Sequence, residues 1–369
     1  MRIVIDARKV GDYGIGTYIQ GLGRVAPSMA PTDEFIYLGD SEETVGTLLV
    51  GPNVSWARNR SRKYGMAELA SVSWQARRLG ADVFHSPHYV YPVMLPCPGV
   101  VSVHDCIHLR FPRHLPSKAA LHYARAMLRH AVRSSQRVLT GSESTRSDLV
   151  ELVDADPAKI DVIPYGCDSY YFERADSEEI EAVRRRHDLE RPFLLFVGNA
   201  KPHKNLRRLL DAFALLAEQY ADLDLVLVGG EQMAIRALLS EQERPELADR
   251  VRLLGFLSKS ELRAIYTLAS VFVFPSLYEG FGLPPLEAMA CGTPVVAGRS
   301  SSLPEVVGHA GLLVNPRKVD AIADAVRILL EDNDLRLAFG QRGREQAREF
   351  TWVRAARRTL DVYAEIARQ

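Results

Sequence analysis

The sequence predicts an α/β fold built from two doubly wound domains. Short apolar runs alternate with amphipathic stretches along most of the chain, which is typical of parallel strands covered by helices. This alternation is interrupted once, by a polar and charged stretch near the middle. At 369 residues the chain is also too long for one ordinary core and fits two domains of roughly 150 to 200 residues. We therefore expect two Rossmann-like domains that face a central cleft.

The first domain is predicted to span residues 1–165. Its apolar runs predict strands at 2–7, 34–40, 53–58, 82–86, 99–105, 137–142 and 160–165, with helical patterns between most of them. The polar stretch 166–191 is interpreted as a linker with one helix.

The second domain is predicted to span residues 166–351. Strands are expected at 192–199, 223–230, 250–256, 270–276, 293–298 and 310–316. The closing stretch 352–369 has a helical apolar stripe and is expected to pack back on the first domain. The stripe consists of Trp352, Ala355, Ala356, Leu360 and Tyr363.

The amino-acid composition indicates a globular protein without a metal or disulfide framework. With 47% hydrophobic and 25% charged residues, the chain has the balance of a soluble globular protein. The chain opens directly on a strand pattern, so we expect no leader and a cytoplasmic location. The four cysteines form no C-x-x-C pair, which argues against a zinc site or a disulfide framework.

The stretch "EGFGLPPLE" places two glutamates, Glu279 and Glu287, around glycines and prolines. Glu279 follows a predicted strand, and the prolines favour the first turn of a helix that carries Glu287. Carboxylates accept hydrogen bonds, so both suit hydroxyl-rich ligands such as a sugar and a ribose. A turn position for Glu279 and a helix-dipole contact for Glu287 fit the same pattern.

Lys204 is the strongest candidate for a cation that meets a diphosphate. It follows the first strand of the second domain in "FVGNAKPHKNLRRLLDAF". A helix end gives an exposed anion only about 0.3 to 1 kcal/mol, whereas a full charge at 4 Å gives about 4 kcal/mol at an effective dielectric of 20. A solvated loop lysine is the plainer alternative.

In the first domain, Gly14 and Gly16 open a predicted helix in "DYGIGTYIQGL". The G-x-G-x-x-G fingerprint is not met, which disfavours a nicotinamide dehydrogenase. The glycine pair fits an anion site at a helix start and equally a tight turn. His104 follows a predicted strand, where it could bind a sugar hydroxyl or move a proton, although a lone histidine is commonly structural.

These motifs together resemble glycosyltransferase family 4, whose members are retaining enzymes of the GT-B fold. The resemblance covers nearly the whole chain and is carried by "EGFGLPPLE", "VGNAKPHKNLRRLLDAF", "LLGFLSKSEL" and "SSSLPEVVGHAGLLVNP". It implies an enzyme that transfers a hexose from a nucleoside diphosphate sugar to a glycan or lipid-linked glycan.

The resemblance also implies roles for particular residues. Glu279 would hold hydroxyls of the donor sugar, Glu287 the ribose and Lys204 the diphosphate. The backbone N–H groups of Phe281, Gly282 and Leu283 would hold the sugar and the distal phosphate, the Gly14–Gly16 loop would meet the donor phosphates, and His104 would lie in the site. Many family members carry an arginine where this chain has Asn199 and His203, which leaves Lys201 and His203 as candidates for the second cation.

The implied chemistry needs no enzymic nucleophile, metal or other cofactor. The D-x-D strings at 222–224 and 332–334 are not placed to hold Mg²⁺ against a diphosphate. "VHDCIHLRFP" and "KPHKN" most resemble polysaccharide-assembly mannosyltransferases, so GDP-mannose is favoured, with a UDP-sugar for a glucosyl- or N-acetylglucosaminyltransferase as the alternative. A non-catalytic two-domain protein that binds a small ligand is the alternative outside the enzymes.

A basic stripe suggests a further partner. Residues 51–140 hold 13 Lys or Arg against 3 Asp or Glu. Lys118, His122, Arg125, Arg129 and Arg133 recur at helical spacing, and Arg58, Arg60, Arg62 and Lys63 add to the excess. A solvated helix face is the common reading. Peripheral contact with anionic lipid at the inner face of a membrane is a second hypothesis for this stripe. We expect no nucleic-acid partner.

Overall fold

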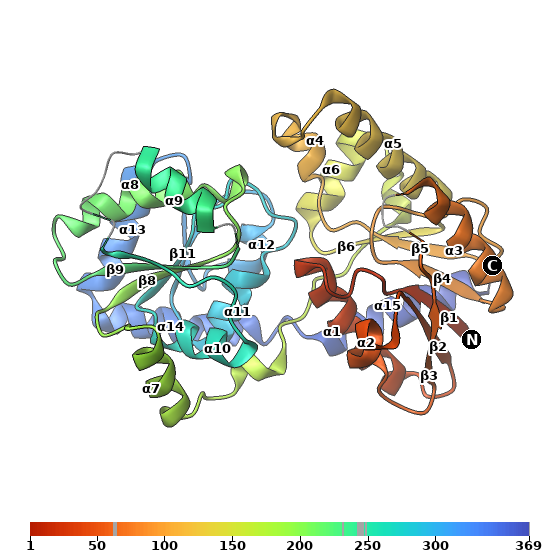
Figure 1. The fold of residues 1–369 in the computed structure, drawn as a ribbon, viewed down its shortest axis with the longest axis horizontal. Coiled ribbons are helices and arrows are strands. Elements are labelled where there is room, and N and C mark those ends of the chain that lie inside the picture. The colour runs from red at the N-terminus through yellow and green to blue at the C-terminus, as the bar shows by residue number, and fades with distance from the viewer. Residues whose placement is uncertain (62–64, 231, 242–246, 248, 369) are drawn as a thin grey trace. The chain divides into compact units, whose positions relative to one another are not determined.

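The computed structural model describes residues 1–61, 65–230, 232–241, 247 and 249–368 (Figure 1). The chain divides into two compact units. Unit 1 consists of Met1–Gly166 and Phe350–Gln369, and unit 2 consists of Cys167–Glu349. Each unit has its own parallel sheet.

Unit 1 holds a seven-stranded sheet in the order β3-β2-β1-β4-β5-β6-β7. Chain order reverses between β1 and β4, as in a doubly wound sheet. The strands are β1 (Arg2–Asp6), β2 (Glu34–Gly39), β3 (Val54–Arg58), β4 (Val83–Ser86), β5 (Gly99–Ser102), β6 (Arg137–Thr140) and β7 (Ile160–Val162). The α-helices are α1 (Tyr13–Met29), α2 (Glu42–Val45), α3 (Met66–Arg78), α4 (Ile107–Arg110), α5 (Lys118–Ser134), α6 (Glu143–Val153) and α15 (Trp352–Ile366).

The last helix, α15, packs against α1 within unit 1. Close approach depends on Gly21, because a Cβ there would lie 2.1 Å from Cε2 of Trp352. Tyr363 of the same helix meets the buried His85, with its hydroxyl 2.5 Å from Nδ1. Along the predicted apolar stripe, Leu360 is only half-buried, and Thr359 takes the buried place because its hydroxyl donates to the carbonyl of Ala355.

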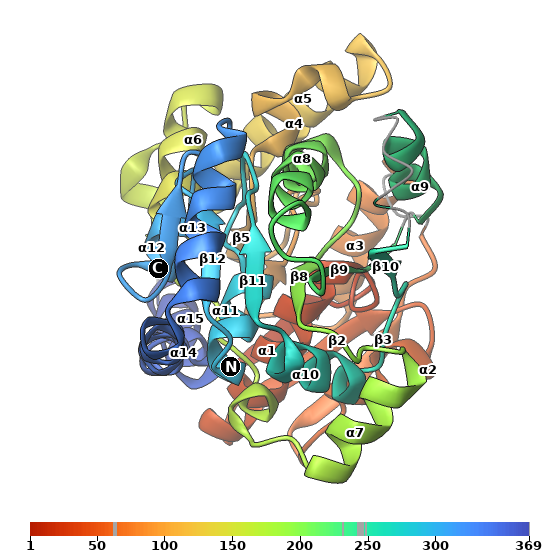
Figure 2. The same cartoon turned by 90° about the vertical axis from the view of Figure 1, so that its left-hand side faces the viewer.

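Unit 2 holds a six-stranded sheet in the order β10-β9-β8-β11-β12-β13, which reverses between β8 and β11. Figure 2 shows β12, β11, β8, β9 and β10 in this order from left to right. The strands are β8 (Phe193–Val197), β9 (Asp224–Val228), β10 (Val251–Leu253), β11 (Val271–Phe274), β12 (Val295–Gly298) and β13 (Leu312–Val314). The α-helices are α7 (Ser177–Arg186), α8 (Leu206–Ala217), α9 (Gln232–Glu241), α10 (Lys259–Leu268), α11 (Leu283–Cys291), α12 (Leu303–Val307), α13 (Val319–Glu331) and α14 (Asn333–Ala347).

Helices cover both faces of this sheet. Figure 1 shows α8 and α13 on one face and α10, α11 and α14 on the other. Strands β9, β11 and β12 are buried along their whole length, which explains why they read as continuous apolar runs rather than as alternating patterns. The predicted α/β class with two doubly wound sheets is confirmed. Among the described residues, no helix is long and apolar enough to cross a membrane.

Candidate active site

Two loops of unit 2 meet where the order of its strands reverses. One follows β8 and the other follows β11, and these strands are neighbours in the sheet. The N–H of Leu277 donates to the carbonyl of His203 at 2.7 Å, and the amide of Asn205 donates to the carbonyl of Pro275 at 2.9 Å. In doubly wound sheets this edge is where ligands bind. The local hydrogen bonds therefore fix both loops at the expected position of a site.

Lys204 and Glu279, one from each loop, form an ion pair. Nζ of Lys204 lies 2.8 Å from Oε1 and 2.9 Å from Oε2 of Glu279. The side chains are only 13% and 11% exposed. Nζ also lies 5.0 Å from the ring centroid of Phe274, whose π face attracts a cation. The two residues, which were selected separately from the sequence, therefore form one ion pair in the structure.

The loop that carries Glu279 is held by two serines. The hydroxyl of Ser301 accepts from the N–H of Glu279 at 2.7 Å. The hydroxyl of Ser302 donates to the carbonyls of Glu279 and Phe281 at 3.0 and 2.7 Å. Phe281 is buried, so it anchors the loop through its ring. The backbone before α11 is thus fixed in place.

Gly282 allows the turn into α11. Its φ of 113° lies in the left-handed region, where a side chain is strained. A Cβ would also lie 2.9 Å from Cδ2 of Leu303. Leu283 and Pro284 then occupy the first turn of α11, where proline costs no hydrogen bond. The predicted sugar- and phosphate-binding N–H groups therefore belong to the turn that opens this helix.

Glu287 lies in the second turn of α11, not in the first turn as the sequence suggested, and it is half-buried. Burial raises the pKa of its carboxyl to about 7. The hydroxyl of Tyr266 donates to Oε2 at 3.0 Å, which opposes that rise. At neutral pH the group is divided between its charged and neutral forms.

The remaining donor-binding candidates of unit 2 lie in the loop after β8. Asn199 is half-buried, and its side-chain oxygen accepts from the N–H of Lys201 at 3.3 Å. The side chain of Lys201 is exposed, whereas His203 is only 6% exposed. Of the two candidates for the second cation, Lys201 is therefore the accessible one.

In unit 1, the two glycines of the predicted anion loop differ in their surroundings. Helix α1 begins at Tyr13, so Gly14 and Gly16 both lie in its first turns. A Cβ on Gly16 would lie 2.3 Å from the carbonyl oxygen of Val10, whereas a Cβ on Gly14 would meet nothing within 4 Å. Gly16 is required by packing within the protein, and Gly14 faces open space.

His104 lies just after β5 and has two protein partners. Nδ1 lies 2.6 Å from the hydroxyl of Tyr165, and Nε2 lies 2.8 Å from the carbonyl oxygen of Pro87. Because a carbonyl oxygen can only accept, Nε2 carries the proton and Nδ1 accepts from Tyr165. Burial lowers the pKa of His104, which favours this neutral form. A ligand would have to replace one of the two partners.

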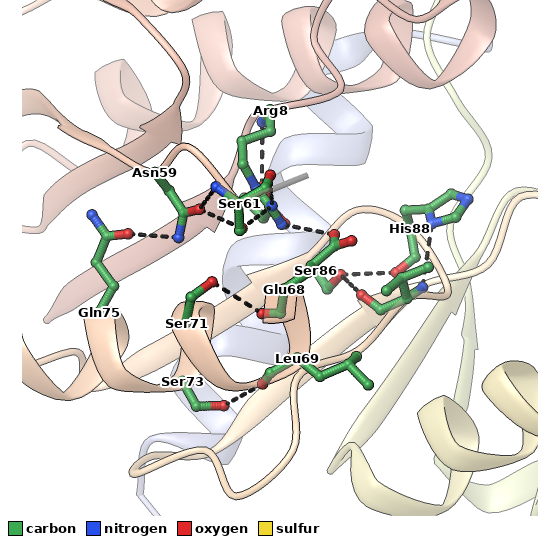
Figure 3. A network of polar contacts seen from close by, with 12 residues as sticks. Arg8, Asn59, Ser61, Glu68, Leu69, Ser71, Ser73, Gln75, Ser86 and His88 are labelled. Atoms are coloured by element: carbon green, nitrogen blue, oxygen red, sulfur yellow. Dashed lines mark hydrogen bonds and ion pairs between the residues drawn. The ribbon is translucent and has the colours of Figure 1, made fainter. Parts of the chain in front are cut away.

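Two further features were not predicted from the sequence. Arg8 is buried after β1, with Nη2 2.8 Å from Oε1 of Glu68 (Figure 3). The same Nη2 lies 2.5 Å from Oδ2 of Asp6. Lys9 is 5% exposed, and its charge contributes to the low pKa of His104. The run "DARK" could have indicated these two residues, because two cations directly after a buried strand are unusual.

The basic stripe lies on α5. Lys118, His122 and Arg133 are exposed, whereas Arg125 and Arg129 are half-buried. Arg129 lies 3.6 Å from Asp154, so part of its charge is balanced. Arg58 and Arg60 are exposed, and Arg62 and Lys63 lie outside the described residues. The opposite face of α5 joins the core of unit 1 through Leu128, Ala131 and Val132.

Two doubly wound units, with an acidic and cationic pair at the switch point of the second, define the GT-B class of glycosyltransferases. The fold matches Anabaena HepE, solved with UDP and glucose, with a TM-score of 0.79 at 20% identity over 99% of this chain and 100% of that one. It also matches WaaG, a glycosyltransferase involved in lipopolysaccharide biosynthesis, with a TM-score of 0.75 at 15% identity over 98% and 99% of the two chains.

Sequence comparison gives the family. The model of Glycosyl transferases group 1 matches residues 177–346, and that of Glycosyltransferase Family 4 matches residues 36–171. The O-antigen chain mannosyltransferase B of Escherichia coli is 33% identical over 292 residues, which cover 79% of this chain and 76% of that protein. The chain belongs to the group 1 glycosyltransferases of family 4, and the predicted enzyme class is confirmed.

Another relative carries a different name. The D-inositol 3-phosphate glycosyltransferase of Kineococcus radiotolerans is 35% identical over 250 residues, which cover 63% of this chain and 58% of that protein. The chain thus spans little more than half of that relative. Membership of the family sets aside the non-catalytic binding protein considered above.

Proposed function

We propose that this enzyme transfers a hexose, with mannose favoured, from a nucleoside diphosphate sugar to a glycan or lipid-linked glycan. The transfer retains the configuration at the anomeric carbon and uses no metal. Support for mannose comes from the mannosyltransferase relative in Escherichia coli. The neighbour solved with UDP and glucose supports a nucleotide sugar as the donor and keeps uridine donors as the alternative.

The observation that carries the proposal is the pair formed by Lys204 and Glu279 at the carboxyl ends of β8 and β11. Two of the three N–H groups of Lys204 point at the carboxylate, which leaves one for a phosphate oxygen. In a nucleotide sugar, the sugar hydroxyls and the distal phosphate lie on either side of one glycosidic oxygen. A carboxylate and an ammonium in contact fit these two adjoining groups.

The reaction breaks the bond between the anomeric carbon and the diphosphate oxygen. The acceptor hydroxyl forms the new bond on the face from which the diphosphate departs. Its proton passes to the departing phosphate, so no enzymic nucleophile is needed. Lys204 and the N–H groups that open α11 stabilise the charge that develops on the diphosphate.

A ligand screen tests the nucleotide. At 100 times its Kd, a nucleoside diphosphate stabilises the protein by about 2.7 kcal/mol. We expect GDP to raise the melting temperature more than UDP or ADP, and GDP-mannose to support transfer with release of GDP. A larger shift with UDP, together with transfer from a UDP-sugar, would replace mannose with the alternative donor.

Metal independence has its own test. Transfer is expected to continue at an unchanged rate in EDTA, because the cationic groups that meet the diphosphate belong to the protein. Loss of transfer in EDTA with recovery in Mn²⁺ would contradict the proposal.

We propose, in addition, that the exposed basic face of α5 rests on anionic lipid. The exposed Lys118 and Arg133 supply most of the charge, at about 1 kcal/mol for each residue near the surface, and the half-buried Arg125 and Arg129 add less to it. Sedimentation with phosphatidylglycerol vesicles should carry the wild-type protein down, and salt or the variant Lys118→Ala/Arg133→Ala should release it. Equal sedimentation of the wild-type protein with neutral vesicles would contradict binding to anionic lipid.

A further inference from the structure

A groove lies between the end of β3 and helix α3, entirely within unit 1. Its volume is about 510 Å³, which is within the range of small-ligand sites. The groove is lined by Ala57, Arg58, Asn59, Arg60, Ser61 and, from α3 and the residue after it, Ser71, Trp74, Gln75, Arg78 and Leu79. None of the residues assigned above to the donor or to lipid contact on α5 lines it.

The groove is strongly cationic. Arg58, Arg60 and Arg78 are exposed, and none of them forms an ion pair with any residue that the structure describes. Glu68 is the one acidic residue between positions 51 and 81, and it is buried against Arg8. Three cations around one concave surface therefore lack a balancing charge within these two segments. An anion would supply it.

Trp74 gives the groove a flat aromatic wall. Its side chain is 61% exposed, although tryptophan is usually well buried. The guanidinium of Arg78 lies 5.5 Å from the centroid of its ring. By contrast, Trp352 is 8% exposed in the same unit. An open indole face attracts the weakly positive C–H groups of a pyranose ring, so Trp74 suits a sugar beside the cations.

The floor of the groove is fixed before any ligand arrives. Nδ2 of Asn59 donates to Oε1 of Gln75 at 2.8 Å, and Nε2 of Gln75 donates to the carbonyl of Arg58 at 2.9 Å. Nη1 of Arg8 donates to the hydroxyl of Ser61 at 2.8 Å, which links the floor to the loop after β1 (Figure 3). A rigid floor lowers the ordering cost of binding.

We propose that this groove binds a phosphorylated saccharide segment of the acceptor. The arginines hold the phosphate, and Trp74 packs against the adjoining sugar ring. The inference rests on the proposed function for its statement that the ligand is an acceptor. The concave shape and the fixed polar floor favour a sugar phosphate over a flat membrane surface. The phosphate belongs either to a free glycan or to a lipid-linked sugar phosphate.

Tryptophan fluorescence tests the groove directly, because Trp56, Trp74 and Trp352 all belong to unit 1. Titration of the full chain with mannose 6-phosphate should change the emission in a saturable way, and Trp74→Phe should abolish that change. Arg58→Ala and Arg78→Ala should each weaken binding about tenfold. Arg77→Ala is the matched control, since Arg77 is exposed beside Arg78 but does not line the groove, and it should bind as the wild type does.

Several results would overturn the inference. Mannose binding as tightly as mannose 6-phosphate would exclude a role for the arginines, and inorganic phosphate binding as tightly would exclude the sugar. A shift of Trp74 emission with phosphatidylglycerol vesicles but not with mannose 6-phosphate would identify a membrane contact instead. Tighter binding of polyprenyl mannosyl phosphate in micelles than of mannose 6-phosphate would support the groove and identify the lipid-linked source.

The test separates this inference from the proposed function. Lys204→Ala should lose transfer while it keeps the fluorescence change, because the groove and the lysine lie in different units. Binding of mannose 6-phosphate without transfer from any nucleotide sugar would reject the proposed function and keep the groove. Transfer from a nucleotide sugar without any binding at Trp74 would keep the proposed function and reject the groove.

Discussion

The contact between Lys204 and Glu279 changes what each residue can be expected to do. If each residue is considered alone, its substitution is expected to cost the protein little stability. In the structure they are nearly buried and paired, so removal of either leaves the other charge without its partner. The pair also holds the loops after β8 and β11 together, in addition to its proposed contact with the donor.

Lys204→Ala is therefore expected to destabilise the protein by about 3 kcal/mol and to lower turnover at least a hundredfold. Glu279→Gln should have effects of the same sign. The double variant should lose less stability than the sum of the two, by about 1 to 3 kcal/mol, because neither charge is then left alone. Urea unfolding followed by circular dichroism measures all three.

Lys201→Ala is the stability control for this comparison, because its exposed side chain in the same loop forms no ion pair with a described residue. It should unfold within about 0.5 kcal/mol of the wild type. Strictly additive losses in the double variant would show that the pair is not energetically coupled.

Glu287 predicts a pH dependence of stability. Its folded-state pKa of about 7 lies above the ordinary value of 4.5, so its contribution is complete below pH 4.5 and falls as the pH rises through 7. The expected loss is about 3 kcal/mol across this window. Glu287→Gln lacks the titration, so its stability relative to the wild type should rise between pH 4.5 and 8. Calorimetry at several pH values would measure this, and a constant difference would contradict it.

The sequence could identify these residues but not their contacts. Glu279 and Lys204 stand out because charged groups follow apolar runs near glycine and proline. Their pairing depends on the order of β8 and β11 in the sheet, which no local pattern contains. The Tyr266 hydroxyl on Glu287 was unpredictable for the same reason, because Tyr266 looks like any buried aromatic residue of α10. The two partners of His104, Tyr165 and Pro87, come from distant parts of the chain.

At the scale of elements, the glycines at the starts of α1 and α11 determine how closely other groups can approach these helices. Helices α1 and α11 each need a glycine near their start for steric reasons. Gly16 lies within the first turns of α1, and Gly282 directly precedes α11. Gly14 differs, because no protein atom lies close to the position that a Cβ would occupy. A methyl group there would contact no other protein atom within 4 Å.

Gly16→Ala should therefore destabilise unit 1 by more than about 2 kcal/mol, since its methyl group would clash with the carbonyl of Val10. Gly14→Ala should keep the wild-type stability and weaken donor binding severalfold. Tryptophan emission during urea unfolding and the KM for the donor measure the two effects. Unchanged KM in Gly14→Ala would place the donor away from this turn.

The strands were more predictable than the helices around them. Every apolar run named from the sequence contains a strand. The pattern is strongest for β9, β11 and β12, because strands buried on both faces need continuous apolar side chains. Short helices such as α4 and α12 left no comparable pattern, since four or five residues make little more than one helical turn and the apolar period does not repeat. Close packing of α15 on α1 depends on the missing side chain of Gly21, whose pattern is that of any helix glycine.

At the scale of the whole molecule, all three tryptophans report on unit 1. Each unit has its own sheet and buried core, so we expect each to melt as a unit. A nucleoside diphosphate that binds at Lys204 should raise the unfolding transition of unit 2, which circular dichroism follows together with that of unit 1. The transition seen by tryptophan emission should move less. Equal shifts in both signals would mean that the units unfold together.

Unit 1 is assembled from two separate stretches of chain, because its last helix follows the whole of unit 2. On the ribosome, the nascent polypeptide therefore exposes the seat for Trp352 and Tyr363 throughout the synthesis of about 180 intervening residues. Unit 2 is complete before that seat is filled. A chaperone that shields apolar surface should accordingly associate with the emerging amino-terminal portion and leave only when α15 is released from the exit tunnel.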